Sequence, residues 1–216
     1  MGKSQGLTAA QRRTLDRLST IPELGGMYLA GGTAIAAHLG HRQSLDLDLF
    51  GPLSVREFAA ARRGIARDLR GVVIVDETDV AVSMLIDRAP VDLVRYAYPL
   101  LRKPTVGPGG IALASLLDLA TMKLSAVARR GIKRDFWDLH EICTVGGISL
   151  RRAARAYAKR FAVAEADLYA VLRSLTYFDD AKAEAIWPKG LTKSHWQTIC
   201  AYFEIEAPKL INIALK

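Results

Sequence analysis

The sequence predicts an α+β domain followed by a helical domain, and three observations carry this prediction. Apolar and polar residues alternate in several short segments of the first hundred residues, which is typical of β-strands. A stretch rich in proline and glycine, residues 98–110, then breaks the pattern. Beyond it, apolar residues recur at helical spacing. We therefore predict a core domain over residues 1–98, a linker over 99–110 and a helical domain over 111–216.

The first hundred residues are expected to hold three helices and five strands. Ser54 and Glu57 stand at the spacing of a capping box and open one of the helices. The expected helices span 9–18, 33–39 and 54–69. The expected strands span 27–30, 44–50, 71–77, 80–86 and 90–96. Short turns join the last three strands, which favours an antiparallel or mixed sheet.

The second half is expected to be helical throughout, with Ser149 and Ser194 as N-caps of two helices. The expected helices span 113–130, 133–143, 150–161, 165–176 and 195–203. The run of arginine and lysine over 151–161 is interpreted either as a solvated basic face or as a surface that contacts an RNA backbone.

Composition narrows the class of protein and of partner. Half of the 216 residues are apolar, and 30 lysines and arginines against 22 aspartates and glutamates give a net charge of +8. This excess favours a polyanionic partner such as nucleic acid or a nucleotide, although charge alone is a weak indication. The N-terminus is polar and no apolar run is long enough to cross a bilayer, so a cytoplasmic protein without a membrane partner is expected.

Asp46 and Asp48 stand one residue apart in the apolar strand pattern "SLDLDLF". Side chains two positions apart on a strand share a face, so the two carboxylates are expected to emerge together. The two negative charges repel each other, so this arrangement becomes favourable when a divalent cation lies between them. Hard oxygen ligands suit Mg²⁺, with Mn²⁺ as the alternative. The plain alternative is a solvent-facing strand face.

A glycine turn precedes this strand. Gly31 and Gly32 lie between a predicted strand and a predicted helix, where bare backbone and helix N–H groups can approach a phosphate. Thr33 offers a hydroxyl to the same phosphate or caps the helix. A phosphate cradle beside a carboxylate pair indicates metal-assisted phosphoryl transfer.

A third metal carboxylate is expected to come from a later strand. Four aspartates are candidates, at positions 76, 79, 87 and 92, and of these Asp92 lies inside the apolar pattern "PVDLVRY". Asp92 is therefore predicted as the third ligand, against the alternative of an ordinary edge-strand aspartate. His38 and His41 have no company at metal-ligand spacing and are interpreted as surface or core histidines.

Lys123 lies on an apolar helix face, so it either reaches a cleft that holds a triphosphate or extends out of a core. Arg130, two turns further along, extends this positive face. On the following helix, Asp135 and Asp138 stand three residues apart. Asp135 is interpreted as a base for the acceptor hydroxyl or as an orienter of Lys123. The alternatives are acidic residues that only stabilise the helix start and a plain Asp–Lys pairing across helices that sets Lys123 in place.

Two motifs together, "AGGTAIAAHLGHRQSLDLDLF" and "KLSAVARRGIKRDFWDLHEI", resemble the AbiEii/AbiGii family of nucleotidyltransferase toxins, which includes the MenT-like enzymes. That family belongs to the DNA polymerase beta-like nucleotidyltransferase superfamily, so the resemblance implies its mixed sheet with flanking helices. It further implies that Asp46 and Asp48 bind the metals with Asp92 as third ligand, that Lys123 meets the nucleotide phosphates, and that Asp135 is needed for transfer. Thr33 stands where many members have serine.

The resulting prediction is an Mg²⁺-dependent enzyme that moves a nucleoside monophosphate from an NTP to an acceptor. By resemblance the acceptor is RNA, with tRNA foremost, and the protein is the toxin of a toxin–antitoxin pair with a cognate antitoxin partner. Two alternatives stay open. One is transfer to a protein or small-molecule hydroxyl, and the other is a catalytically inactive domain that binds nucleotide or RNA.

Overall fold

The computed structural model describes residues 6–214, and the chain divides into two compact units between Ser115 and Leu116. This division lies later than the sequence predicted. Residues 99–110 were expected to form a linker, and the helical domain was expected to begin at residue 111. Instead, Thr105–Val106 and Ala112–Leu113 are short strands that pair with each other and join the sheet of the first unit. Pairing of this stretch is a long-range contact, which the local proline and glycine content does not reveal.

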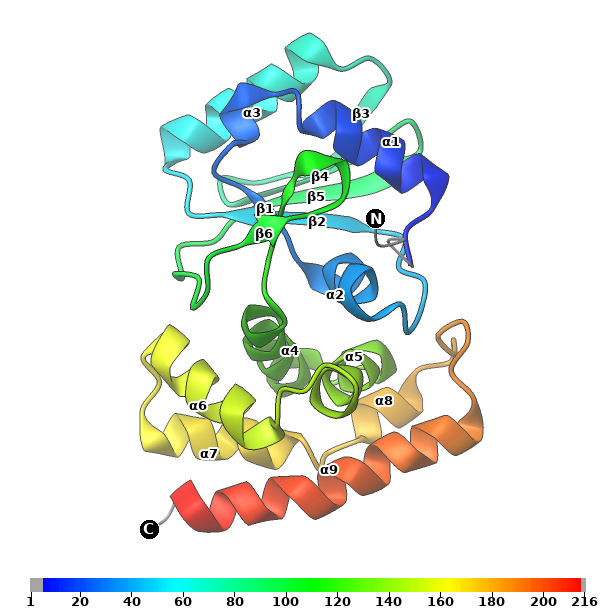
Figure 1. The fold of residues 1–216 in the computed structure, drawn as a ribbon, viewed down its shortest axis with the longest axis vertical. Helices are drawn as coiled ribbons and strands as arrows, with labels where there is room; N and C mark the ends of the chain where they lie inside the picture. The colour runs from blue at the N-terminus through cyan, green and yellow to red at the C-terminus, as the bar shows by residue number, and fades with distance from the viewer. Residues whose placement is uncertain (1–5, 215–216) are drawn as a thin grey trace. The chain divides into compact units, whose positions relative to one another are not determined.

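The first unit is built on a seven-stranded mixed sheet in the order β3-β4-β5-β2-β1-β7-β6 (Figure 1). Its strands are β1 (Tyr28–Leu29), β2 (Leu47–Gly51), β3 (Val72–Glu77), β4 (Ala81–Ile86), β5 (Ala89–Arg95), β6 (Thr105–Val106) and β7 (Ala112–Leu113). β3, β4 and β5 form the expected antiparallel meander, whereas β2 runs parallel to β5 and β7 runs parallel to β1. The mixed sheet with flanking helices confirms the predicted fold class.

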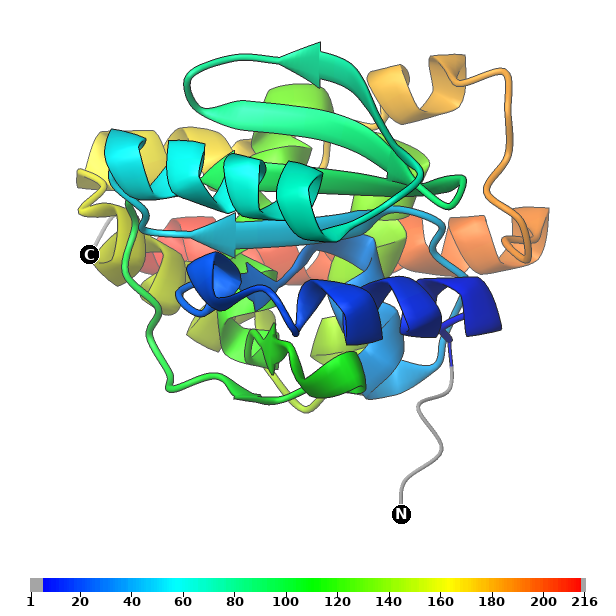
Figure 2. The same cartoon turned by 90° about the horizontal axis from the view of Figure 1, so that it is seen from above.

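Among the residues that the structure describes, three α-helices pack on this sheet, α1 (Ala9–Leu18), α2 (Gly31–Leu39) and α3 (Val55–Asp68). Seen from above in Figure 2, α1 and α3 cover one face of the sheet, and α2 lies on the opposite face. Capping boxes begin α1 at Thr8 and α3 at Ser54, the latter as predicted. Two single 3₁₀ turns, Pro22–Leu24 and Pro108–Gly110, complete the unit.

Two local predictions around the aspartate strand need correction. The helix α2 begins at Gly31 and not at Thr33, so both glycines belong to its first turn. The strand β2 begins at Leu47, where pairing with Val91 of β5 starts, so Asp46 lies just before the strand. Leu45 consequently does not share the buried face of Leu47 and Leu49, and 67% of it is exposed.

The second unit consists of helices α4 (Leu116–Arg130), α5 (Lys133–Thr144), α6 (Leu150–Phe161), α7 (Glu165–Ser174), α8 (Asp179–Ala183) and α9 (Lys193–Ala214). α4 packs against α5, α6 and α7, while α9 packs along α5 and α7 (Figure 1). The rings of Phe136, Phe178, Trp196 and Phe203 meet in the core between α5 and α9.

The predicted helix positions in this unit are largely confirmed, and the differences concern α8 and α9. Ser149 caps α6 as expected, by accepting a hydrogen bond from the Arg152 N–H at 3.3 Å. Thr192, not Ser194, caps α9, because its hydroxyl accepts the His195 N–H at 3.2 Å. α8 was not predicted, and α9 continues past residue 203 and contains Pro208. Within residues 6–214 no helix combines the length and apolar character that crossing a bilayer requires.

Candidate active site

Two candidate aspartates of the first unit meet on adjacent parallel strands, and a third lies just before one of them. Asp48 of β2 is the register partner of Asp92 of β5, and paired strands lie about 4.8 Å apart. Both aspartates are half-buried, while their neighbours Leu47 and Leu49 on β2 are fully buried on the other face of the sheet. Asp46 precedes Asp48 by two residues and is half-buried like it. We call Asp46, Asp48 and Asp92 the acidic edge.

The other three candidate aspartates lie away from the acidic edge. Asp76 is on β3, where its row continues through Ser83 of β4 to Asp92, so two strand spacings, about 10 Å, separate it from Asp92. Asp79 lies in the turn between β3 and β4, and Asp87 lies in the turn between β4 and β5, where it forms an ion pair with Arg17. Register therefore distinguishes Asp92 from the alternatives.

Gly31 brings the start of α2 against the acidic edge. Its φ of +62° is the left-handed conformation that glycine tolerates best, and a Cβ there would lie 2.6 Å from Cγ of Asp48. The N-cap residue of α2 is Ala30, whose methyl group cannot accept hydrogen bonds from the first-turn N–H groups. These N–H groups and the positive end of the helix dipole thus lie next to the carboxylate of Asp48.

Gly32 permits a second close approach, which the sequence analysis did not anticipate. A Cβ on Gly32 would overlap the Arg42 guanidinium and lie 2.9 Å from Oγ of Ser44. Arg42 is half-buried and donates to the carbonyl of Gln43 at 3.0 Å. The fold therefore places a cation at the helix start, from a loop whose sequence, "GHRQS", carries no motif that would have identified it.

Thr33 has a different environment from the predicted phosphate contact. The residue is fully buried, and its hydroxyl donates a hydrogen bond to the backbone carbonyl of Asp46. This bond ties α2 to the segment that enters β2. We therefore assign Thr33 as a positioning residue for the acidic edge rather than a ligand of phosphate.

In the second unit, a buried ion-pair cluster joins α4 to α5. Lys123 Nζ lies 2.8 Å from Oδ1 of Asp135 and 2.8 Å from Oδ2 of Asp138. Arg130 adds two hydrogen bonds to Asp135, from Nε at 2.8 Å and from Nη2 at 3.1 Å. The side chains of both aspartates are fully buried, that of Lys123 is 10% exposed, and that of Arg130 is 61% exposed. We call these four residues the Lys123 cluster.

The electrostatics of the Lys123 cluster favour the charged forms of Lys123 and Asp135. Burial by itself would lower the pKa of Lys123, but the charges of Asp138 and Asp135 outweigh it and raise that pKa above its ordinary value of 10.5. Burial would raise the pKa of Asp135, yet Lys123 and Arg130 hold it below its ordinary value of 3.8. A carboxylate with a lowered pKa is a weak base, so this geometry favours the orienting role over the base role for Asp135.

Asp138 contributes as closely to this cluster as Asp135, although the sequence analysis did not place it among the site residues. Its spacing of three residues from Asp135 put it on the same helix face, which was the signal that could have identified it. Lys123 therefore projects from an apolar helix face toward two carboxylates, which compensate its buried charge.

The basic helix α6 divides into two sides. Arg151, Arg152, Arg155 and Lys159 are exposed, as a solvated or nucleic-acid-binding face requires. Arg160 is instead buried, and its Nη1 donates to Oγ1 of Thr121 at 2.9 Å and to the carbonyl of Asp118 at 3.0 Å. This arginine fastens α6 to α4 and belongs to the core.

The chain is similar to known proteins over most of its length. Residues 13–104 and 77–212 match the family model for the "Nucleotidyl transferase AbiEii toxin, Type IV TA system". An uncharacterized protein of Aquifex aeolicus (strain VF5) is 30% identical over 200 residues, which are 92% of this chain and 94% of that protein.

Solved structures show the same fold at low sequence identity. A proposed nucleotidyltransferase from H. pylori aligns with a TM-score of 0.51 at 18% identity, over 96% of this chain and 99% of that one. ANT(2'')-Ia in complex with adenylyl-2''-tobramycin aligns with a TM-score of 0.53 at 15% identity, over 71% of this chain and 98% of that one. The fold of this chain is thus the one found in polymerase-beta-like nucleotidyltransferases.

Proposed function

Because the chain belongs to the AbiEii family of nucleotidyl transferase toxins, we propose that it transfers a nucleoside monophosphate from an NTP to a hydroxyl group of RNA, with tRNA as the foremost acceptor. In this reaction the acceptor oxygen forms a bond to the α-phosphorus, and the bond from that phosphorus to the bridging oxygen breaks. Pyrophosphate leaves, and the hydroxyl proton passes to solvent. Nucleotidyl transfer is the activity of the family to which the chain belongs. RNA as the acceptor and a divalent metal as the cofactor are what we propose.

The observation that carries the proposal is the register of Asp48 with Asp92 beside the glycine turn at Gly31. Asp48 and Asp92 on adjacent strands, with Asp46 just before β2, offer hard oxygen ligands, which fit Mg²⁺, or Mn²⁺ as the alternative. Asp46, Asp48 and Asp92 would hold the metal. When bound, such a cation offsets negative charge on the triphosphate and on the attacking oxygen.

The start of α2 supplies groups that suit the terminal phosphates. The first-turn N–H groups at Gly31 and Gly32 and the guanidinium of Arg42 lie together there, and each stabilises an anion. These groups differ from the predicted set in one respect, because Arg42 takes the place that was expected for the Thr33 hydroxyl. We propose that they bind the β- and γ-phosphates.

The Lys123 cluster of the second unit is proposed, by the family resemblance, to supply positive charge to nucleotide phosphates. Arg130 is the most exposed cation of the cluster, so its guanidinium is the group best able to reach a phosphate, and Lys123 follows as predicted from the family resemblance. Asp135 and Asp138 hold Lys123 in one orientation. A preorganised cation of this kind stabilises charge that develops on the leaving pyrophosphate.

The test is incorporation of label from NTPs that are labelled at the α-phosphate, each of the four in turn, into total RNA and into purified tRNA. We expect transfer by the unmodified chain in Mg²⁺ and a loss of more than about 10³-fold in Asp48→Asn and Asp92→Asn, because each removes a charged metal ligand. Asp76→Asn is the matched control, since it removes a carboxylate from the same sheet and row, about 10 Å away from Asp92.

Two outcomes would contradict parts of the proposal. Full transfer by Asp48→Asn and Asp92→Asn would refute the role of the acidic edge. Label that enters a protein or a small-molecule hydroxyl while RNA stays unlabelled would refute the RNA acceptor and leave the transferase intact. The likeness to ANT(2'')-Ia, whose complex contains adenylyl-2''-tobramycin, makes an aminoglycoside the first small molecule to include.

The biological setting follows from the family. The model that matches the chain describes a toxin of a type IV toxin–antitoxin system, so we propose a cognate antitoxin as its partner and growth arrest as the result of its activity. We place the reaction in the cytoplasm, where NTPs and tRNA occur together. The net charge of +8 and the four exposed basic side chains of α6 support a nucleic-acid acceptor.

A further inference from the structure

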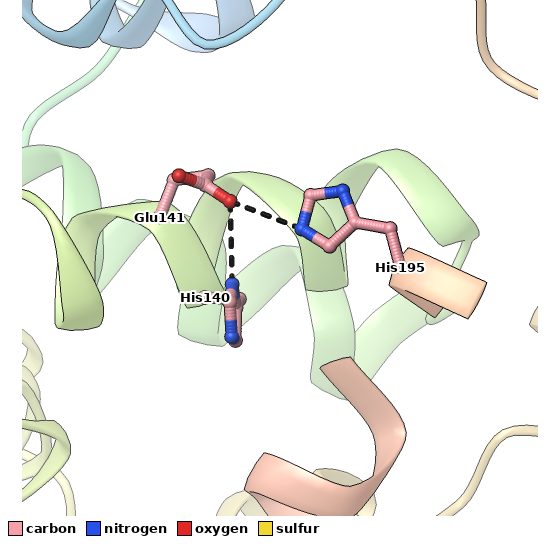
Figure 3. A group of neighbouring side chains, drawn as sticks. All are labelled: His140, Glu141 and His195. Carbon is pink, nitrogen blue, oxygen red and sulfur yellow. Dashed lines mark hydrogen bonds and ion pairs between the residues drawn. The ribbon is translucent and has the colours of Figure 1, made fainter. Parts of the chain in front are cut away.

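Three side chains from α5 and α9 converge on one point that the proposed transferase chemistry does not use. Oε1 of Glu141 lies 3.3 Å from Nδ1 of His140 and 3.4 Å from Nε2 of His195 (Figure 3). One ligand atom from each residue lies within 4.8 Å of the others. We propose that His140, Glu141 and His195 form a binding site for a divalent transition metal of the Zn²⁺ type, here called the His–Glu–His site.

The distances between the donor atoms match the size of such a site. Zinc binds histidine nitrogen at about 2.0–2.1 Å and carboxylate oxygen at about 2.0–2.2 Å, so adjacent ligands of a tetrahedral ion lie roughly 3.3–3.5 Å apart. The two separations measured from Glu141, 3.3 Å and 3.4 Å, already equal this edge. The remaining separation, between ligand nitrogens of the two imidazoles, is no more than 4.8 Å.

The donor types distinguish this site from the acidic edge. Two imidazole nitrogens and one carboxylate oxygen suit Zn²⁺ and its borderline neighbours, whereas Mg²⁺ prefers oxygen ligands alone. Three protein ligands also leave one position of a tetrahedral ion for water or another small ligand. The two sites are therefore expected to select different metals from the same solution.

Packing holds the two imidazoles in place. The ring of His195 packs edge-on against that of Trp137, with their centroids 5.7 Å apart. The ring of His140 packs edge-on against that of Tyr202, with their centroids 5.1 Å apart. The Thr192 hydroxyl fixes the backbone of His195 at the start of α9. Ligands that are already oriented lose little conformational entropy on binding, which favours a specific site over a loose surface contact.

Exposure decides how a metal would enter. The side chains of His140 and Glu141 are 9% and 11% exposed, but that of His195 is 34% exposed. The ion would thus be reached from the His195 side and would fasten the start of α9 to α5. Because α5 also carries Asp135 and Asp138, the metal would stiffen the helix that orients Lys123.

The test measures Zn²⁺ binding to the full chain after chelator treatment, by equilibrium dialysis in excess Mg²⁺, so that oxygen-only sites are occupied by the harder ion. We expect one Zn²⁺ per chain, a visible Co²⁺ spectrum of a four-coordinate site, and a higher unfolding temperature with Zn²⁺. Removing a residue that binds the metal directly should lower metal affinity more than removing one that only hydrogen-bonds to such a ligand. Glu141→Gln and His195→Gln are therefore expected to weaken Zn²⁺ binding by more than about 100-fold.

His41→Gln is the matched control, because it removes an imidazole from the first unit and should leave the stoichiometry and affinity unchanged. Asp46→Asn/Asp48→Asn is a second control, which should also retain the Zn²⁺. Unchanged Zn²⁺ binding in both Glu141→Gln and His195→Gln would overturn the proposal. It would also be overturned if either control variant lost Zn²⁺ affinity as strongly as Glu141→Gln and His195→Gln are expected to. Binding is the readout throughout, so this result does not depend on whether the chain transfers nucleotides.

Discussion

Replacing Lys123 with methionine should destabilise the second unit strongly, although methionine fits an apolar helix face. The change removes the ammonium that lies 2.8 Å from both Asp135 and Asp138. Asp135 keeps its hydrogen bonds from Arg130, but the fully buried Asp138 loses the cation that the cluster provides. Removing one partner of a buried ion pair costs about 3–5 kcal/mol, because the charge left behind is no longer compensated.

The magnitude can be read from urea denaturation. At a slope of about 2 kcal/mol per M, a loss of about 4 kcal/mol lowers the midpoint by roughly 2 M. Trp137, Trp187 and Trp196 are the three tryptophans of the chain, and all lie in the second unit, so tryptophan fluorescence reports on the unfolding of this unit selectively. The matched variant is Lys123→Met/Asp138→Asn, which also removes the negative charge of Asp138.

We expect the double variant to be more stable than Lys123→Met alone, with a coupling of about 1–3 kcal/mol between the two positions. Asp138→Asn alone should cost less than Lys123→Met, since Lys123 then still pairs with Asp135. A loss below about 1 kcal/mol in Lys123→Met, or a double variant that is no more stable than Lys123→Met, would refute the view that this lysine is held by two buried carboxylates.

Three further predictions concern backbone strain, a positioning hydrogen bond and pH. Gly31→Ala should lower transfer by about 100-fold, because its Cβ would displace the carboxylate of Asp48. Gly110→Ala, with a φ of +79° and no atom closer than 3.9 Å, should instead cost only about 1 kcal/mol of stability, and equal activities of the two variants would contradict this. Thr33→Val should reduce transfer about tenfold, and Thr33→Ser should restore it, as measured by label incorporation. The lowered pKa of Asp135 contributes stability that is fully present above pH 3.8 and is lost as pH falls further, while the raised pKa of Lys123 contributes stability that is fully present below pH 10.5 and is lost as pH rises. The difference in fluorescence-monitored stability between the unmodified chain and Lys123→Met should therefore shrink outside these limits, and an alkaline decline of the same size in Lys123→Met would exclude the lysine as its cause.

Local patterns were sufficient for most of the secondary structure. Most of these patterns depend on residues that are close in the sequence, so a single sequence is enough to detect them. They include the capping box of α3, the alternation in β4 and β5 and the helical periodicity of α4 to α7. The same holds for the pairing of Asp46 with Asp48 as candidates, which their spacing of two residues indicated, although Asp46 lies just before β2 and not on it. Short elements were missed, because β6, β7 and α8 are stabilised by distant neighbours rather than by their own sequence.

Relations between distant segments were decided by the tertiary structure alone. Parallel pairing of β2 with β5 places Asp92 opposite Asp48, and no periodicity within either strand specifies that register. The left-handed backbone of Gly31, the approach of Arg42 to Gly32 and the meeting of His195 with Glu141 likewise depend on how elements pack. The sequence by itself therefore identified most candidate residues for nucleotide transfer, although not Arg42, because charge and spacing are local properties. Only the folded chain determined which of them meet, because contact between distant residues follows from the packing of the whole unit.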